Sequence, residues 1–360
     1  MGQTDFRFGG ASGVAVAKSK AASVEQAVAD LAAQLPSDEL ALLLLFVSPS
    51  YDPHQFIAEI SRQFDGIPVC GCTTAGELAP DGWDENSVVA LAFSRTDFAA
   101  VVRPILNLDG FHVEDGRRIS AEARQELLRA SPDVERGNSF GLVLIDGLCG
   151  REEAVMSAIY ASLDDIPIVG GSAGDGMRFE RTFVFLDGKA HTNAALLILL
   201  STSLPFRVFK CDNFEPRPQK MVVTEADIEQ RVVKELNAEP AASEYSRAVG
   251  IIDAKLDPFS FASHPVLVRV GGLRCQRWCG NRAGLSIRSR ACQGFARILV
   301  PILDCRAGLT YRLVVVRGPV RLAVRTSASH VENRGSIPLR GANSVLFQAL
   351  IVPKPGKIAH

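Results

Sequence analysis

The sequence has no apolar run long enough to cross a bilayer. Its longest apolar runs, at 40–47 and 194–200, are far shorter than the roughly 20 residues that a spanning helix needs. The N-terminus has no charged-then-apolar leader, and Phe6 stands where a myristoylation signal has Ser or Thr. We therefore expect a cytoplasmic protein with no membrane partner.

Sequence signatures of common catalytic sites are also absent. There is no GxSxG elbow, no HExxH, no GxxxxGK[ST] phosphate loop and no CxxCH for covalent haem attachment. Cys149 is the most credible nucleophile, because it lies just before an expected helix start, which can lower the pKa of a thiol. A cysteine-dependent enzyme is one alternative, and a small residue that closes a loop is the other. We expect no enzyme.

The sequence has eight cysteines and no recognisable export signal. We therefore expect reduced thiols rather than a disulfide framework. Cys70 and Cys72 face one way along an expected strand, but they belong to an apolar run, where buried thiols are common. The cysteines at 275, 279, 292 and 305 have a spacing that matches no zinc ribbon or knuckle. We expect no metal site.

The composition indicates a globular protein with room for two domains. The chain has 360 residues, of which 47% are hydrophobic and 22% charged. Its net charge of −1 hides a split. Residues 1–270 hold 24 Lys and Arg against 38 Asp and Glu, whereas residues 271–360 hold 15 against 2. The two parts do not share one composition.

A glycine-rich motif occurs twice. IPVCGCTTAGEL at 67–78 returns as IPIVGGSAGDG at 166–176, and an offset of 99 residues aligns Gly71 with Gly170. Deleting one Thr then aligns Ala75 with Ala173. The elements around the motifs also repeat, so the sequence predicts an internal repeat of about 38–94 and 138–201.

Each repeat is expected to alternate strands and helices. The first has a helix at 23–35, a strand at 40–47, a helix that buries Phe56, Ile57 and Ile60, and strands at 67–71 and 86–93. Asp52 can cap the second helix, with Pro53 in its first turn and Gln55 closing a capping box. The second repeat has strands at 140–145, 166–171 and 193–200, with a helix at 152–163. The LDGKA turn at 186–190 predicts a hairpin, and therefore mixed sheets.

The predicted fold class is α/β: two repeated strand-helix-strand units with mixed sheets form the N-terminal domain, and a smaller α+β C-terminal domain follows. We expect an N-terminal ligand-sensing domain at 10–204 and a proline-bearing linker at 205–220. The second domain starts at 221–272, with a strand followed by two short helices. Residues 273–360 form a basic segment of doubtful fold.

Four loops that leave strand ends are the candidate ligand site: SPSYDP, GCTTAGE, DGLCGRE and GGSAGDG. Their glycines can turn N–H groups toward a small anionic or zwitterionic ligand. The expected ligand contacts are hydroxyls from Ser48, Thr73, Thr74 and Ser172, carboxylates for an amino group from Glu77, Asp146 and Asp175, and Arg151 for a carboxylate. The alternative is that the glycines only end strands and the hydroxyls only satisfy turns.

Several motifs in order resemble the FIST family of bacterial sensory proteins: GCTTAGEL, LIDGLCGREE, GGSAGDG, VVKELNAEPAASEY and FASHPVLVRVGG. The resemblance runs from about residue 10 to about residue 272. It implies a signal-input module for small ligands such as amino acids, signalling to a partner such as a histidine kinase. Some members resemble haem-based nitric-oxide sensors, so haem is an alternative, with His54, His191 and His264 as candidate ligands.

The resemblance stops near Gly272, where the arginine content rises. The last 90 residues hold 13 arginines, against 17 in the preceding 270. These arginines are scattered among apolar residues with few aromatics, which disfavours a nucleic-acid partner. We hypothesise that 273–360 is a frameshift product, which would leave the second domain without its closing strands.

Overall fold

The structure is a computed structural model with two compact units, of which the first holds the described residues up to 208 and the second those from 215 to 317. Each unit is described by itself. No helix in the described part of the chain has the length and hydropathy to cross a membrane. The structure describes residues 13–36, 39–133, 137–163, 166–176, 178–206, 208, 215–227, 232–251, 256, 260–261, 264 and 266–269, with the strand backbone of 284–287, 297–299 and 312–317.

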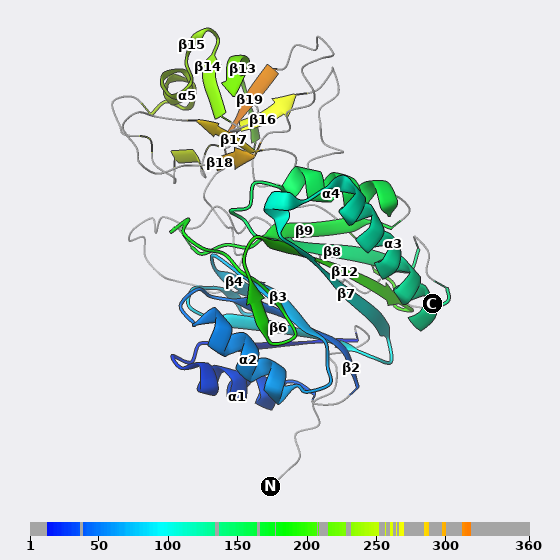
Figure 1. The fold of residues 1–360 in the computed structure, drawn as a ribbon. Helices are drawn as coiled ribbons and strands as arrows, with labels where there is room; N and C mark the ends of the chain where they lie inside the picture. The colour runs from blue at the N-terminus through cyan, green and yellow to red at the C-terminus, as the bar shows by residue number, and fades with distance from the viewer. Residues whose placement is uncertain are drawn as a thin grey trace, which may run out of the picture. The chain divides into compact units, whose positions relative to one another are not determined.

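Unit 1 contains two mixed sheets (Figure 1). The first has the order β1 (Val14–Ser19), β6 (Val88–Ser94), β2 (Leu40–Val47), β3 (Val69–Thr73), β10 (Val184–Leu186) and β11 (Lys189–His191). The second has the order β7 (Phe98–Leu106), β12 (Ala194–Thr202), β8 (Ser139–Ile145) and β9 (Ile168–Ser172). Among the described strands of unit 1, the pairs β2–β3 and β8–β9 are parallel and the others antiparallel, so the predicted mixed sheets are confirmed.

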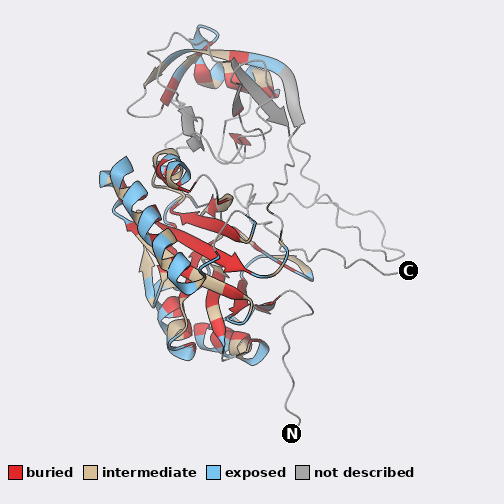
Figure 2. Cartoon of the chain, turned by 90° about the vertical axis from the view of Figure 1, so that its right-hand side faces the viewer, coloured by how far each residue is buried: buried red, intermediate tan, exposed pale blue. Residues whose placement is uncertain are grey.

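The two sheets pack face to face between two pairs of helices. Helices α1 (Val24–Gln34) and α2 (Pro53–Gln63) cover the outer face of the first sheet, and α3 (Val113–Ala130) and α4 (Glu152–Ser162) cover that of the second. Between the sheets, alternate side chains of β2 and β12 such as Leu44 and Leu196 form a third apolar cluster. Figure 2 shows the buried strands between helices whose outer faces are exposed. Unit 1 is therefore a four-layer α/β/β/α sandwich.

Local sequence signals fix the helix starts. Ser23 caps α1, and the Asp52 carboxylate caps α2 by accepting from the Gln55 N–H at 2.7 Å. The predicted capping box is not formed, since among the described residues the Gln55 side chain accepts no bond from the Asp52 N–H; its amide nitrogen donates to Glu25 of α1 at 2.7 Å. The Gln55 side chain therefore contacts the neighbouring helix α1, whereas the local sequence pattern predicted a contact within α2.

The elements of unit 1 follow one order twice, and this repeated order starts earlier than the predicted repeat. The order β1-α1-β2-α2-β3-β4-β5-β6 returns as β7-α3-β8-α4-β9-β10-β11-β12, with β4 (Glu77–Ala79) and β5 (Gly82–Asp84) forming the first hairpin. The repeats thus begin at β1 and β7 rather than near residues 38 and 138. Arg103 and Pro104 interrupt the apolar pattern of β7, and α3 contains many charged residues. For these reasons neither element was predicted from the sequence.

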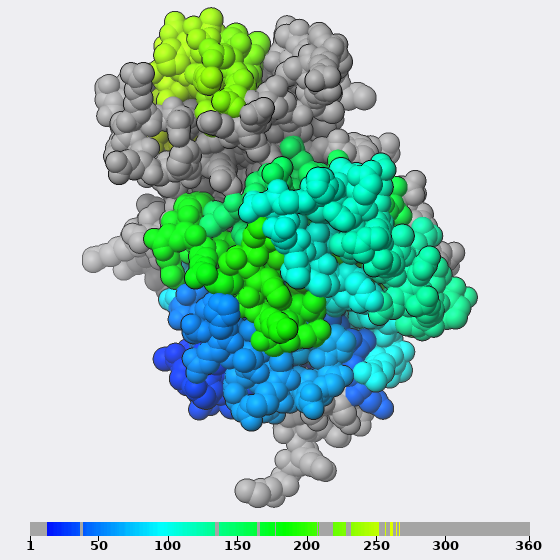
Figure 3. All heavy atoms as spheres, viewed as in Figure 1, coloured from blue at the N-terminus to red at the C-terminus, as the bar shows by residue number. Residues whose placement is uncertain are grey.

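The second hairpin crosses between the repeats. β10 pairs with β3 of the first repeat, in the other sheet from β9 and β12. Asp187 and Gly188 both have positive φ, 44° and 79°, as a type I′ hairpin turn requires, which confirms the predicted hairpin. Figure 3 shows the green surface of this hairpin segment against the blue surface of the first repeat. The repeats are interlocked rather than merely stacked.

Unit 2 is a mixed sheet with one described helix, α5 (Ala241–Val249). The sheet order is β16 (Val266–Arg269), β19 (Arg312–Arg317), β13 (Glu215–Asp227), β14 (Val232–Leu236), β17 (Gly284–Ile287) and β18 (Arg297–Leu299), with β15 (Glu239–Pro240) beside β14. The first of the two predicted short helices is wrong, because its segment forms β14, in which Val232 and Val233 are buried. The second predicted helix is α5, with Tyr245 fully buried.

Strand β13 begins at Glu215, inside the segment predicted as a linker. Its pairing with β19 shifts register between Pro216 and Lys220, and an irregularity of this kind accommodates prolines in a strand. The segment 273–360 supplies the backbone of β17, β18 and β19, and otherwise lies outside the described residues. The frameshift hypothesis concerns the gene and stays a prediction.

Candidate functional site

The two copies of the repeated motif touch each other. The Gly174 N–H donates to the carbonyl of Thr73 at 2.9 Å. Thr73 also pairs with Phe183 just before β10: the Thr73 N–H donates to the Phe183 carbonyl at 2.9 Å, and the Phe183 N–H donates to the Thr73 hydroxyl at 3.0 Å. The loop after β3 is thus bonded to two segments of the second repeat.

The other two loops join the same place. The Gly147 N–H donates to the Thr182 hydroxyl at 3.0 Å, and Arg178 donates to the carbonyl of Pro49 at 3.2 Å. All four loops that the sequence singled out therefore meet. We call residues 48–53, 73–77, 146–152 and 173–183 the loop junction.

Packing explains the repeated glycines of the motif. A Cβ on Gly71 would lie 2.1 Å from the Leu45 carbonyl oxygen, and a Cβ on Gly170 would lie 2.1 Å from that of Val143. Gly76 has a φ of +134° and lies against the indole of Trp83. These glycines permit close approach of neighbouring groups.

Asp146 and Asp175 are buried and bonded within the junction. Asp146 accepts hydrogen bonds from the Leu148 N–H at 2.9 Å, the Asn193 N–H at 2.5 Å and the Thr182 hydroxyl at 2.5 Å. Asp175 accepts from three successive N–H groups, of Phe179, Glu180 and Arg181, at 2.9, 2.7 and 2.9 Å. These internal bonds occupy the carboxylates that were expected to hold a ligand amino group.

Glu77 is also turned inward. Its carboxylate accepts from the Ser87 N–H at 3.2 Å, from the Ser87 hydroxyl at 2.6 Å and from the Thr74 hydroxyl. Burial raises the pKa of Glu77 above its ordinary value, and the bonds from Ser87 and Thr74 only partly oppose this shift. Glu77 therefore joins the loop after β3 to the start of β6.

Three of the four candidate hydroxyls have internal partners. Ser48 accepts from the Ser50 N–H at 3.3 Å and from the Ser50 hydroxyl at 3.0 Å, and Thr73 is bonded to Phe183 as above. Thr74 is half-buried and donates to Glu77 and, at 3.3 Å, to the Val47 carbonyl. For Ser172, which is half-buried, no side-chain hydrogen bond is present among the described residues. Ser172 is thus the most available of the predicted hydroxyls.

Among the described residues, the exposed charged side chains of the loop junction are three arginines and two acids: Arg151, Arg178, Arg181, Asp52 and Glu180. Arg151 is exposed and donates to the carbonyl of Asp109 at 3.1 Å. Arg181 lies over the Phe183 ring with its Cζ 5.2 Å from the ring centroid, and the His54 ring meets Phe183 edge-on at 5.5 Å between centroids. Arg178, which donates to Pro49, and Arg181, which lies over Phe183, form what we call the cationic rim. Arg178 and Arg181 were not singled out from the sequence, although they directly follow the second glycine motif.

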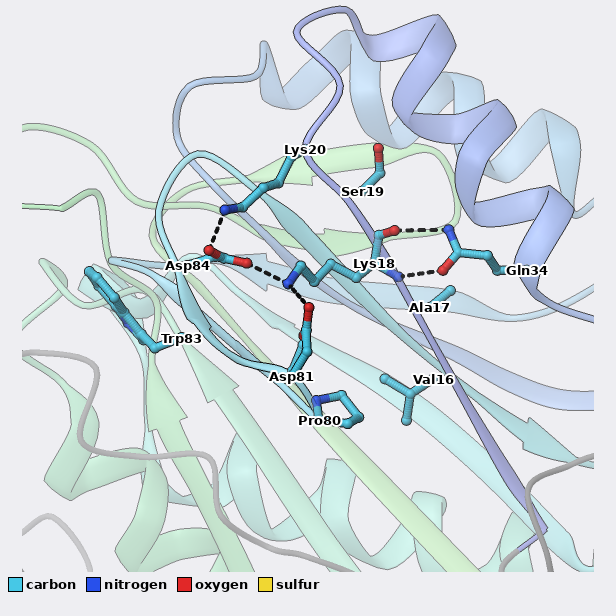
Figure 4. A pocket seen from close by; sticks show the side chains of 11 residues that line it. Val16, Ala17, Lys18, Ser19, Lys20, Gln34, Pro80, Asp81, Trp83 and Asp84 are labelled. Carbon is cyan, nitrogen blue, oxygen red and sulfur yellow. Dashed lines mark hydrogen bonds and ion pairs between the residues drawn. The ribbon is translucent and has the colours of Figure 1, made fainter. Parts of the chain in front are cut away.

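None of the eight predicted site residues lines either of the two pockets that stand out in the described residues. The larger pocket, of about 690 Å³, lies between β1, α1 and the β4–β5 hairpin (Figure 4). In it Lys18 contacts both Asp81, at 2.6 Å, and Asp84, which also pairs with Lys20. A smaller pocket of about 510 Å³ lies between β7 and α3. The charges that line the larger pocket already neutralise one another.

The three cysteines that the structure describes lack the surroundings of a reactive thiol. Burial, followed by the charge of Glu152, raises the pKa of the Cys149 thiol, opposite to the lowering expected from a helix start. Cys70 and Cys72 are buried between the sheets, and burial raises the pKa of Cys72 to about 12. Both pack as small apolar residues.

The described histidines do not fit a haem site. His54 is exposed, and His191 is half-buried with a pKa that burial lowers. His264 belongs to unit 2, where its carbonyl accepts from the buried Tyr245 hydroxyl at 2.9 Å. Neither pocket is lined by a histidine, whereas haem needs an axial ligand in an apolar cavity. Among the described residues, no group of three or more His, Cys, Asp or Glu is placed to hold a metal ion.

More than half of the chain is similar to a known protein family. The FIST N domain matches residues 41–239, and the chain belongs to the FIST family, to which a sensory and signalling role is assigned. The uncharacterized protein MJ1623 of Methanocaldococcus jannaschii is 26% identical over 196 residues, which cover 52% of this chain and 37% of the relative. The chain thus spans little more than a third of that relative.

A solved structure of cyanuric acid hydrolase aligns with 85% of this chain and 99% of its own, at 10% identity and a TM-score of 0.34. A score this low supports no argument about the fold or the activity of this protein.

Proposed function

We propose that this protein is a sensor that binds a small ligand with a carboxylate group, such as an amino acid, at the cationic rim, and passes the signal to a partner protein. One observation carries the proposal. Arg178 donates to Pro49 of the first repeat, and Arg181 lies over Phe183, which is bonded to Thr73 of the first repeat, so a ligand held by these arginines could contact both repeats.

The distribution of charge at the junction favours an anionic group. The acids Glu77, Asp146 and Asp175 are buried and accept internal hydrogen bonds, whereas Arg178 and Arg181 are exposed and outnumber the one exposed acid of their segment, Glu180. Arginine donates two parallel hydrogen bonds to a carboxylate, which makes it well suited to bind one. The Phe183 ring and the Pro49 carbonyl hold the two arginines near the junction, which reduces the side-chain entropy that binding costs.

Fewer side chains of the junction are available to bind the remainder of the ligand. The Ser172 hydroxyl is available, and the half-buried Thr74 hydroxyl could exchange its bond to Val47 for one to the ligand. A role for the three buried carboxylates would require opening bonds that hold the loops, so we leave them out of the proposal. The proposal contains no catalytic step, and the signalling partner, a histidine kinase or another protein, follows from the family alone.

A thermal-shift screen with amino acids and simple carboxylates, followed by calorimetry, tests the proposal. The double variant Arg178→Ala/Arg181→Ala should weaken binding of a confirmed ligand by at least about tenfold, since two charge-assisted hydrogen bonds are lost. The matched control Arg117→Ala/Arg129→Ala on α3 removes the same charge from the exposed surface and should bind as the wild type does. Unchanged affinity in the first variant would exclude the cationic rim.

A variant in the larger pocket distinguishes ligand binding at the cationic rim from ligand binding in that pocket. Lys18→Met removes the ion pairs with Asp81 and Asp84 in Figure 4. Normal binding is expected in this variant. Loss of binding here, with normal binding in the arginine variant, would place the ligand in the pocket and contradict the proposal.

A further inference from the structure

Among the described residues, the outer edge of strand β9 is not paired with another strand. In the first repeat the equivalent edge, that of β3, is paired with β10. The Gly141 N–H donates to the Pro167 carbonyl and the Ala173 N–H donates to the Ile145 carbonyl, so Ile168, Gly170 and Ser172 turn their backbone groups away from β8. In the first repeat the equivalent residues, 99 positions earlier, turn toward β10. Among the described residues no strand lies beside β9 on this side.

The first repeat does not supply the missing strand. Its hairpin β4–β5 corresponds to β10–β11, but within the described chain it forms a two-stranded sheet of its own. The buried Glu77 and the ion pairs of Lys18 with Asp81 and Asp84 hold this hairpin in place. Among the described residues the interlocking of the repeats is thus one-sided, and none of these strands pairs with the outer edge of β9.

The other sheet edges of unit 1 carry features that prevent strand pairing. On β1 the Gln34 amide takes both outward backbone groups of Lys18, donating to its carbonyl at 2.8 Å and accepting from its N–H at 3.2 Å. On β7, Arg103 and Pro104 disrupt pairing, and β11 is three residues long and includes Lys189. β9, with the sequence IVGGS, has no charged residue and no proline. An unprotected edge of this kind is expected to be covered.

We propose that β9 is a dimer interface, at which two copies of this chain pair their β9 strands antiparallel around Gly170. In this register Ile168 lies opposite Ser172 of the second copy and Gly170 lies opposite itself, which gives on the order of six hydrogen bonds. The edge is self-complementary, as a twofold interface must be. Because neither copy brings a charge to β9, pairing leaves no charge of this strand desolvated and unpaired. The two four-stranded sheets would become one continuous sheet, and this inference does not depend on the proposed ligand.

Cysteine cross-linking tests the register. In the double variant Ile168→Cys/Ser172→Cys, each new cysteine lies opposite the other one of the second copy, at a Cα separation of about 5.5 Å, which a disulfide can span. In either single variant, the two new cysteines of a dimer lie four residues apart along the strands, about 13 Å, which is too far. The double variant should therefore form a cross-linked species of twice the 38.7 kDa chain under mild oxidation, while the single variants and the wild type stay at the chain mass on a non-reducing gel.

Light scattering of the full chain gives an independent measurement. The wild type should have twice the chain mass, and Ser172→Pro, which removes an outward N–H from β9, should shift it toward the monomer. The matched variant Val16→Pro changes the protected edge of β1 and should stay dimeric. If Ser172→Pro proves unfolded by circular dichroism, the cross-linking result decides. A monomeric wild type, or single variants that cross-link as well as the double variant, would overturn the proposal.

Discussion

Gly71 and Gly170 occupy the same place in the two repeats, and neither leaves room for a side chain. A Cβ on either residue would lie 2.1 Å from a carbonyl oxygen of the neighbouring parallel strand, that of Leu45 or that of Val143. The repeated glycine of the motif is therefore a requirement of strand packing in both sheets. The ligand site has to be argued from other residues of the loops.

Replacing either glycine should destabilise unit 1 strongly. We expect Gly71→Ala and Gly170→Ala each to lower the free energy of unfolding by more than about 3 kcal/mol, because a backbone carbonyl cannot move aside as a flexible side chain can. Gly110→Ala is the control, since the nearest atom to its Cβ is the Asn107 side-chain amide nitrogen at 3.1 Å, and it should be close to neutral. Urea denaturation measures the differences. Mild effects in the first two variants would contradict the close approach.

Asp175 should act mainly on stability. Asp175→Ala leaves the N–H groups of Phe179, Glu180 and Arg181 without their acceptor and should cost about 2 kcal/mol. Asp175→Asn keeps one acceptor oxygen and should cost less. Chemical denaturation of both variants checks this order. If Asp175→Ala kept wild-type stability but lost ligand binding, Asp175 would be a ligand contact instead.

Glu77 should make the stability of unit 1 depend on pH. Burial raises its pKa in the folded state above the ordinary value of 4.5, so the folded state holds the proton over a range where the unfolded chain has lost it. Stability should therefore fall as pH rises from about 4.5 through the raised pKa. Glu77→Gln cannot titrate and should lack this part of the slope. Urea denaturation of both proteins from about pH 4 to about pH 8 tests it, and parallel pH profiles would count against it.

Cys149 should react slowly with alkylating agents. Burial and the charge of Glu152 disfavour its thiolate, which is the reactive form. With iodoacetamide at about pH 7.5, peptide mass spectrometry should show much slower labelling of Cys149 than of free cysteine. Rapid labelling would restore Cys149 as a candidate nucleophile.

Much of the fold could be predicted from short stretches of sequence. The helix starts at Ser23 and Asp52, the strand at 40–47 and the Asp-Gly hairpin turn follow from capping, apolar pattern and turn chemistry, which act between residues close in the chain. Two local predictions were wrong because contacts with distant residues replaced the local ones. The Gln55 amide bonds Glu25 rather than closing a capping box, and the segment predicted as a short helix forms strand β14.

The sequence by itself determined that the chain contains a duplicated α/β unit and that four polar loops follow its strands, because both properties are written in periodicity and repetition. Only the tertiary structure decided which polar groups of those loops remain available to a ligand. The Thr73 hydroxyl is hydrogen-bonded to the backbone of Phe183, which is 110 residues away. A carboxylate oxygen of Asp146 accepts from the Thr182 hydroxyl, which is 36 residues away. A buried polar group must find a partner, and its identity depends on how the two repeats interlock, which no local pattern records.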